Sequence, residues 1–135
     1  MINMNNTQTT HIRDFTQLKV WNRAIDLSDH IYGVLDKFPQ YEEYATKTQI
    51  IKSANSVSAN IAEGNSQCSV KRELYHINIA IGSTMETKSW LLLSLRRNYI
   101  TQEQFDQINL VINEIVKMLH GYRKKLFMYL EGEEE

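Results

Sequence analysis

Proline and glycine are scarce in this sequence, which has one proline and five glycines in 135 residues. Both residue types interrupt helices and mark turns, so their scarcity favours long helices over a loop-rich β fold. No segment shows the strict alternation of apolar and polar residues that is typical of a half-buried strand. The length suits one domain with a single sizeable hydrophobic core.

Cysteine and long apolar runs are equally scarce. The single cysteine, Cys68, cannot form an intrachain disulfide, which fits a reducing compartment. No apolar run approaches the roughly 18 residues that a membrane-spanning helix needs. The start of the chain, MINMNNTQTTH, lacks the apolar centre of a signal peptide. We therefore expect a cytoplasmic protein with no membrane segment, in which residues 1–14 form a disordered polar leader.

The net charge of −1 hides an uneven distribution. Four of the 16 acidic residues lie in an acidic tail, residues 131–135, so residues 1–130 carry 15 basic and 12 acidic residues. The basic residues cluster late in the chain, at Lys71 and Arg72, at Arg96 and Arg97, and at Arg123, Lys124 and Lys125. Such clusters commonly form a solvated helix face, and they are also the residue types that bind phosphate.

Apolar periodicity predicts four helices, over residues 18–38, 41–63, 70–97 and 101–130, within a folded region of residues 15–130. The first helix carries two apolar stripes. One contains Leu18, Trp21, Ile25, Tyr32 and Leu35, and the other contains Leu27, Ile31, Val34 and Phe38. A helix with two stripes has two neighbours, and Pro39 is expected to end it.

The second helix contains the unusual stretch SANSVSANIAEGNSQ, residues 53–67, whose composition would also suit a flexible linker. At helical spacing its residues sort into two faces, which a linker would not show. Ala54, Val57, Ser58 and Ile61 form an apolar face, and Ser53, Ser56, Asn60 and Glu63 form an opposite polar face. We expect Asn60 and Glu63 to bond to a neighbouring helix or turn. Gly64 is expected to close the helix in the left-handed conformation.

The last two helices begin and end at recognisable signals. Ser69 is a residue type that caps helix starts, Asn98 can adopt the left-handed conformation that ends a helix, and Thr101-x-x-Gln104 is a capping box. The expected core stripes are Leu74, Ile77, Ile81, Met85, Leu92 and Leu95, and then Phe105, Ile108, Ile112, Ile115, Leu119, Tyr122, Leu126 and Tyr129. The sequence therefore predicts an all-α, antiparallel up-down-up-down four-helix bundle. Its buried core is expected to include Trp21, Ile61, Ile81, Ile112 and Leu119.

No residues form a recognisable catalytic or metal-binding set. Glu73 and His76 have the Glu-x-x-His spacing of di-iron bundles, but the other helices contain no second copy. No base can be assigned to Cys68, and the remaining histidines show no ligand spacing. Gly82, inside the third helix, is expected to admit a neighbouring side chain. We therefore expect a non-enzymatic protein with no catalytic residue, no cofactor and no metal.

Several segments together resemble one known family. FTQLKVWNRAIDLSDHIY, SVSANIAEG, IAIGSTMETKSWL and NYITQEQF are similar to a four-helix-bundle family first noticed in intervening sequences of bacterial large-subunit ribosomal RNA genes. Its members carry the legacy label S23 ribosomal protein. The resemblance extends over about residues 15–126. Its most specific residues form a structural motif of Asn60, Glu63 and Gly64, followed by Gly82, Ser83 and Glu86.

The resemblance implies a homopentamer of such bundles. Related proteins are accessory factors of diversity-generating retroelements, in which a basic pentamer binds nucleic acid and a reverse transcriptase. For this chain, the resemblance implies an oligomer that binds RNA, DNA or a nucleic-acid enzyme. Gln67, where the family often has an arginine, and the acidic tail both weaken that expectation. The alternative is a protein–protein interaction scaffold that binds no nucleic acid.

Antiparallel packing selects the residues for a nucleic-acid site. Lys71 and Arg72 begin the third helix at the end of the bundle where Arg123, Lys124 and Lys125 finish the fourth. Arg96 and Arg97 belong to the opposite end, roughly 40 Å away at about 1.5 Å per residue. We therefore expect the first five to be the nucleic-acid-binding residues.

Overall fold

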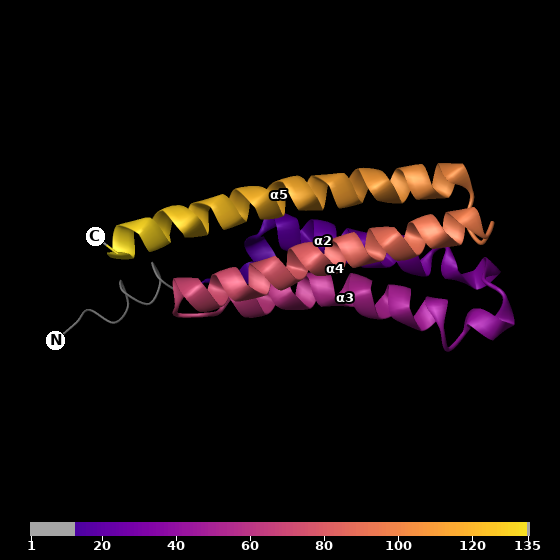
Figure 1. The fold of residues 1–135 in the computed structure, drawn as a ribbon, viewed down its shortest axis with the longest axis horizontal. Helices are drawn as coiled ribbons and strands as arrows, with labels where there is room; N and C mark the ends of the chain where they lie inside the picture. Colours follow the sequence, from indigo (N-terminus) through magenta and orange to yellow (C-terminus); the bar gives the residue numbers. More distant parts are fainter. Residues whose placement is uncertain (1–12, 135) are drawn as a thin grey trace.

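The structure is a computed structural model that describes residues 13–134. These residues form four α-helices and three short 3₁₀ turns, with no strand among them, and consecutive helices run antiparallel (Figure 1). The helices are α2 (Lys19–Tyr32), α3 (Thr46–Asn65), α4 (Val70–Arg96) and α5 (Gln102–Glu134), and the turns are η1 (Phe15–Gln17), η2 (Leu35–Lys37) and η3 (Gln40–Glu42). The predicted all-α four-helix bundle is confirmed.

The helices differ greatly in length. α5 has 33 residues, about 50 Å, whereas α2 has only 14. At the end of the bundle where α4 begins, α5 therefore extends beyond the other helices (Figure 1). Phe127, Met128 and Tyr129 are exposed near the C-terminal end of α5. None of the helices in residues 13–134 combines the length and apolarity that crossing a membrane requires.

The first two helices are shorter than predicted. α2 ends at Tyr32 instead of Phe38, and α3 begins at Thr46 instead of residue 41. Leu35 and Phe38 are nevertheless buried, and Phe38 packs against the ring of Tyr99 with centroids 5.1 Å apart. The apolar pattern thus continues through 3₁₀ turns, which bury the same side chains without α-helical hydrogen bonds.

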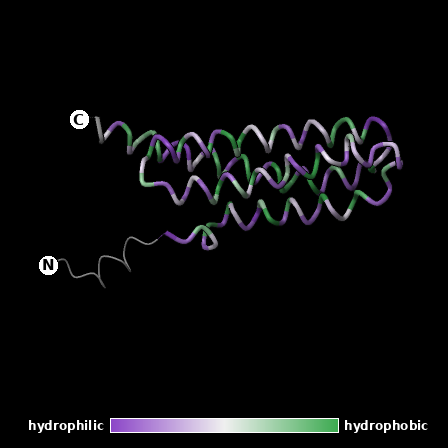
Figure 2. Tube along the Cα trace, turned by 90° about the horizontal axis from the view of Figure 1, so that it is seen from below, coloured by the Kyte–Doolittle hydropathy of each residue, from purple (hydrophilic) through white to green (hydrophobic). Residues whose placement is uncertain are grey.

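The core of α2 comes from one of its two predicted stripes. Leu27 and Ile31 are fully buried, whereas Trp21 and Ile25 are half-buried and Tyr32 is exposed. Of the predicted core residues, Ile61, Ile112 and Leu119 are fully buried, and Trp21 and Ile81 are only partly so. Hydrophobic residues recur between hydrophilic ones along each helix (Figure 2). The outer stripe is only partly buried, but α2 packs against both α3 and α5, as predicted for a helix with two neighbours.

The predicted core stripe of α4 is wrong by about one residue. The buried face consists of Glu73, Ile77, Ala80, Thr84, Thr87, Leu91 and Ser94. Leu74, Ile81 and Leu95 flank it, and Met85 and Leu92 are 42% and 46% exposed. Small side chains occupy this face because α4 packs against both α3 and α5, and the hydroxyls of Thr84 and Ser94 donate to the carbonyls of Ala80 and Trp90. The larger apolar residues are displaced outward.

The predicted caps of the last two helices are present. The Ser69 side chain accepts a hydrogen bond from the backbone of Arg72, and Asn98 has a left-handed φ of 63°. Thr101 and Gln104 form the capping box, with reciprocal bonds of 2.9 and 3.1 Å between backbone N–H groups and side-chain oxygens. These local signals fixed the starts of α4 and α5 correctly.

Both ends of the folded region differ from expectation. Arg13 and Asp14, assigned to the leader, belong to the fold, because Asp14 caps η1 and Arg13 bonds to Glu73. Residues 1–12 lie outside the described residues. The predicted acidic tail continues helix α5 as far as Glu134.

We expect Ile112→Ala to lower the free energy of unfolding by roughly 2–5 kcal/mol, because it opens a cavity at a fully buried position. The matched control is Leu110→Ala on the same helix, at an exposed position, where a change of less than about 0.5 kcal/mol is expected. Urea denaturation measures both. Equal midpoints for the two variants would contradict the assigned core face of α5.

Candidate functional site

The polar stripe of residues 53–67 lies against α4 of the same chain. The hydroxyls of Ser53 and Thr87 are 2.9 Å apart, as are those of Ser56 and Ser83. One turn further on, the Asn60 amide donates to the Ser56 carbonyl, and its Oδ1 lies 3.1 Å from Nδ1 of His76. The polar and apolar faces of α3 are therefore adjacent, not opposite as predicted, because α4 covers one and the core covers the other.

Contrary to the prediction, Gly64 does not close α3. It lies inside the helix without a positive φ, and the helix continues to Asn65. A Cβ at this position would be 3.0 Å from Cβ of His76 and 3.3 Å from the carbonyl oxygen of Glu73. Gly64 thus allows the backbones of α3 and α4 to approach closely. Close approach is a role of glycine that is separate from ending a helix in the left-handed conformation.

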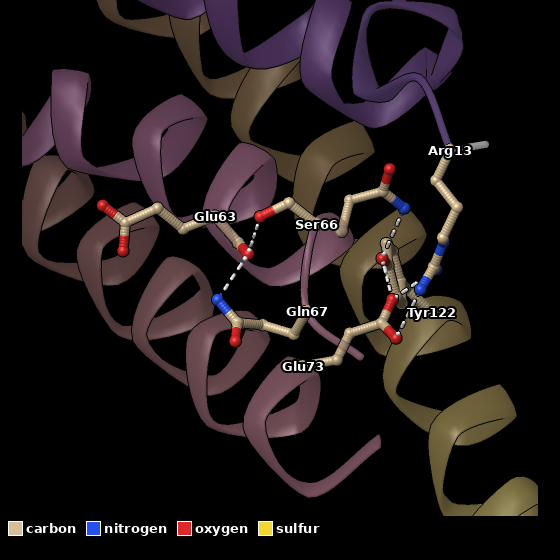
Figure 3. A network of polar contacts seen from close by, with 7 residues as sticks. Arg13, Glu63, Ser66, Gln67, Glu73 and Tyr122 are labelled. Carbon is tan, nitrogen blue, oxygen red and sulfur yellow. Dashed lines mark hydrogen bonds and ion pairs between the residues drawn. The ribbon is translucent and has the colours of Figure 1, made fainter. Parts of the chain in front are cut away.

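The other motif residues lie around this helix pair. The Glu63 carboxylate is 3.5 Å from Nδ1 of His76, and its backbone carbonyl accepts hydrogen bonds from Ser66 and Gln67 (Figure 3). Glu86 accepts from the indole N–H of Trp90, one turn further along α4. Gly82 is exposed, and no atom lies within 4 Å of a Cβ placed there. It therefore admits no side chain of its own chain, contrary to the prediction.

Among the residues that the structure describes, Glu73 is the most buried charged residue, with 3% of its surface exposed. Arg13 donates two hydrogen bonds to its carboxylate, from Nη1 to Oε1 at 3.1 Å and from Nη2 to Oε2 at 2.7 Å (Figure 3). Tyr122 donates its hydroxyl to the same carboxylate, and Asn65 donates to the Tyr122 oxygen at 3.1 Å. The network joins α3, α4, α5 and the segment before η1, and it neutralises a buried negative charge.

The network raises the pKa values of Tyr122 and Arg13. Burial, and secondly the hydrogen bond to Glu73, raise the pKa of Tyr122 to about 12. The hydrogen bond to Glu73 raises the pKa of Arg13, which keeps the guanidinium charged. Sequence reasoning missed Arg13, Asn65 and Tyr122 as polar partners. The available signal was Glu73 itself, because it is in helical register with Ile77 and Ala80, and a buried acid needs a partner.

Glu73 and His76 do not act as one pair. Glu73 faces Tyr122 of α5, whereas His76 faces Asn60 of α3. Within the described residues, no three His, Cys, Asp or Glu side chains come together in a way that could hold a metal ion. Cys68 is exposed in the connection between α3 and α4. The side chains around Glu73 and His76 therefore interact through hydrogen bonds and charge.

The five predicted nucleic-acid-binding residues belong to helix segments at the same end of the bundle, as expected from the antiparallel order. Arg123 of α5 donates to the side-chain oxygen of Asn78 of α4 at 3.2 Å, which places the last turns of α5 beside the first turns of α4. We call Lys71, Arg72, Arg123, Lys124 and Lys125 the basic end. All are exposed except Arg123, which is half-buried. Arg96 and Arg97 line a separate surface hollow with Leu92 and Leu93, near the opposite end of α4.

A cavity of about 740 Å³ opens beside the basic end. Its walls combine the Glu73 network with apolar side chains of α4 and α5. The residues that line it are Arg13, Leu18, Asn65, Val70, Glu73, Met118, Gly121, Tyr122, Lys125, Leu126 and Tyr129. Arg13 and Glu73 neutralise each other, so Lys125 supplies the remaining charge among the residues that line this cavity.

Comparisons with known proteins agree with the fold. The sequence profile described as 23S rRNA-intervening sequence protein matches residues 16–121. The fold is similar to a crystal structure from Bacteroides thetaiotaomicron VPI-5482, described as a protein of unknown function from the S23 ribosomal protein family. The two share 31% sequence identity and a TM-score of 0.72, over 78% of this chain and 98% of that chain. A search of curated proteins found no match. The profile match ends before Tyr122 and Arg123.

We expect Gly64→Ala to lower the free energy of unfolding by about 1–3 kcal/mol. The new methyl group would meet Cβ of His76 and the backbone of Glu73, neither of which can move without shifting helix α4. Gly121→Ala is the matched control, because nothing lies within 4 Å of the added Cβ, and it should stabilise by about 0.5–1 kcal/mol. Chemical denaturation compares them, and stabilisation by both substitutions would rule out the close approach.

We also expect the stabilising effect of the Tyr122 hydroxyl to depend on alkaline pH. Its raised pKa favours the neutral phenol in the folded state, so its contribution is full below the unfolded pKa of about 10. The contribution is lost as pH rises through the folded pKa of about 12. Unfolding free energies of the unmodified chain and Tyr122→Phe should differ by a constant amount below about pH 10. Above it, the advantage of the unmodified chain should shrink. A difference that stays constant across this range would show that the phenol is not bonded to Glu73.

Proposed function

The chain belongs to the 23S rRNA-intervening sequence protein family, and we propose that it is a non-enzymatic, oligomeric bundle that binds RNA, DNA or a nucleic-acid enzyme through its basic end. The observation that supports the proposal is the Arg123–Asn78 contact, which sets the part of α5 that contains three of the basic residues beside α4, the helix that contains the other two. A cytoplasmic location is part of the proposal and suits the free thiol of Cys68.

The charges of the basic end are available to a ligand. Within residues 13–132, none of its five side chains forms an ion pair. The buried carboxylate of Glu73 is paired with Arg13 instead, so it does not compete for them. Lysine and arginine contacts to phosphate are independent of base sequence and weaken as salt increases. The expected binding is therefore salt-dependent, with little sequence preference.

Oligomerisation is the second part of the proposal, with a homopentamer as the expected assembly. Gly82, Met85 and Leu92 follow one stripe on the outer surface of α4 and are exposed among the described residues. A glycine inside an exposed helix costs up to about 1 kcal/mol relative to alanine. Close approach of another subunit would compensate that cost. A ring of subunits would also repeat the basic end and increase affinity through avidity.

A protein–protein scaffold without nucleic-acid binding is the second candidate. Phe127, Met128 and Tyr129 are exposed near the C-terminal end of α5. Adjacent exposed apolar residues are typical of a surface that another protein covers. In that case, the basic residues would form a solvated helix face that binds no nucleic acid. The two candidates differ in whether RNA binds.

We expect light scattering at micromolar concentration to give about five times the 15.8 kDa chain mass. Met85→Glu combined with Leu92→Glu should lower the mass toward one chain while the helical circular dichroism remains, because it places charges on the proposed contact stripe. The matched control, Leu110→Glu on the exposed surface of α5, should keep the assembly. A monomeric unmodified chain would refute the oligomer.

We expect weak, salt-sensitive RNA binding that strengthens when residues 131–135 are deleted, because their acidic side chains oppose the field of the basic end. Filter binding of a structured RNA, at low and moderate salt, compares the full chain with residues 1–130. Lys71→Gln, Arg72→Gln and Lys124→Gln together should abolish binding. Arg96→Gln with Arg97→Gln, at the other end, should have little effect. If neither length binds RNA, the scaffold candidate replaces this proposal.

A further inference from the structure

Aromatic side chains alternate with basic ones on one surface of the basic end. On α4, Lys71 is followed one helical turn later by Tyr75, which is 64% exposed. On α5, Arg123 is followed one turn later by Phe127, which is 47% exposed. Residues four apart lie on the same face of a helix. Each helix therefore presents a basic side chain and an aromatic ring on the same face.

The Arg123–Asn78 contact joins the two faces into one surface. Asn78 lies one turn beyond Tyr75 on α4, on the face that carries Lys71 and Tyr75. Because the helices are antiparallel, the step from Arg123 to Phe127 on α5 runs in the same direction as the step from Asn78 toward Lys71 on α4 (Figure 1). Phe127 is thereby placed toward the start of α4, near Tyr75 and Lys71.

The rings of Tyr75 and Phe127 contribute little to the packing of the fold. Tyr75 contacts the ring of His76 edge-on, with centroids 5.3 Å apart, and its hydroxyl forms no hydrogen bond within the described residues. Phe127 is not part of the hydrophobic core. Large apolar rings held at the surface between cations bind partners that offer both a flat π face and negative charge.

We propose that this surface binds single-stranded nucleic acid, with unpaired bases stacked on Tyr75 and Phe127 and the adjoining phosphates held by Lys71 and Arg123. The proposal rests on the proposed function and specifies the class of its ligand. Unpaired bases expose their faces to an aromatic ring, whereas the bases of a duplex are already stacked on each other. A purely electrostatic surface would need no aromatic residues, and a protein partner would need no repeated cations.

The test measures the affinity of fluorescently labelled single-stranded RNA and of the same sequence annealed into a duplex, by anisotropy at several salt concentrations. Tyr75→Leu and Phe127→Leu remove the rings and keep apolar bulk. Each should weaken single-strand binding by roughly 5- to 150-fold and leave the salt dependence unchanged. Tyr75→Phe, which keeps the ring, should retain the affinity. Tyr44→Leu is the matched control, because Tyr44 is 94% exposed and lies near the start of α3, at the other end of the bundle.

The charge variants complete the test. Lys71→Gln and Arg123→Gln should each weaken binding and reduce the salt dependence by about one phosphate contact. If single strand and duplex bind equally and the leucine variants have no effect, the stacking proposal fails and the proposed nucleic-acid function stands. If no nucleic acid binds, both fail. If the leucine variants weaken binding of single strand and duplex alike and alter oligomer mass, the rings form a contact between protein subunits, and the stacking proposal is overturned.

Discussion

The close approach of α3 and α4 at Gly64 is the constraint on which much of this structure depends. With a side chain there, Cβ of His76 and the backbone of Glu73 could not occupy their present positions. The approach brings Asn60 and Glu63 within reach of His76 and turns Glu73 into the interior. A buried carboxylate then requires partners, and Arg13 and Tyr122 supply them. The close approach at Gly64 thus lies next to a network that joins four segments of the chain.

The same packing decides what the outer surface presents. Because the face of α4 in the core is built from small and hydroxyl-bearing residues such as Thr84 and Thr87, its larger apolar residues, Met85 and Leu92, point outward. On α5, greater length has a similar effect, since its last turns extend past the shorter helices. Apolar surface that a monomeric bundle would bury is therefore left available for partners.

Basic residues are clustered along the sequence in spite of a net charge close to zero. Arg13 neutralises Glu73 internally, and the five residues of the basic end carry their charges beside exposed aromatic rings. This arrangement links the fold to the proposed function, because a localised field attracts phosphate even when the total charge does not. The match to the 23S rRNA-intervening sequence protein family covers residues 16–121, so the α5 half of the basic end is a feature of this chain beyond the matched region.

Local sequence signals determined the elements of this protein, and tertiary contacts determined how they are used. The caps at Ser69, Asn98 and Thr101 could be read from the sequence because they depend on residues within one helical turn. The core stripe of α5 was also predicted correctly from Phe105 to Leu126, but its last predicted member, Tyr129, is exposed. The antiparallel order also predicted which basic residues share an end. The phase of the α4 core, the packing role of Gly64 and the partnership of Arg13 with Glu73 could not be read in this way. They join residues up to 60 positions apart, and they arise from how closely two helices approach, which no local pattern encodes.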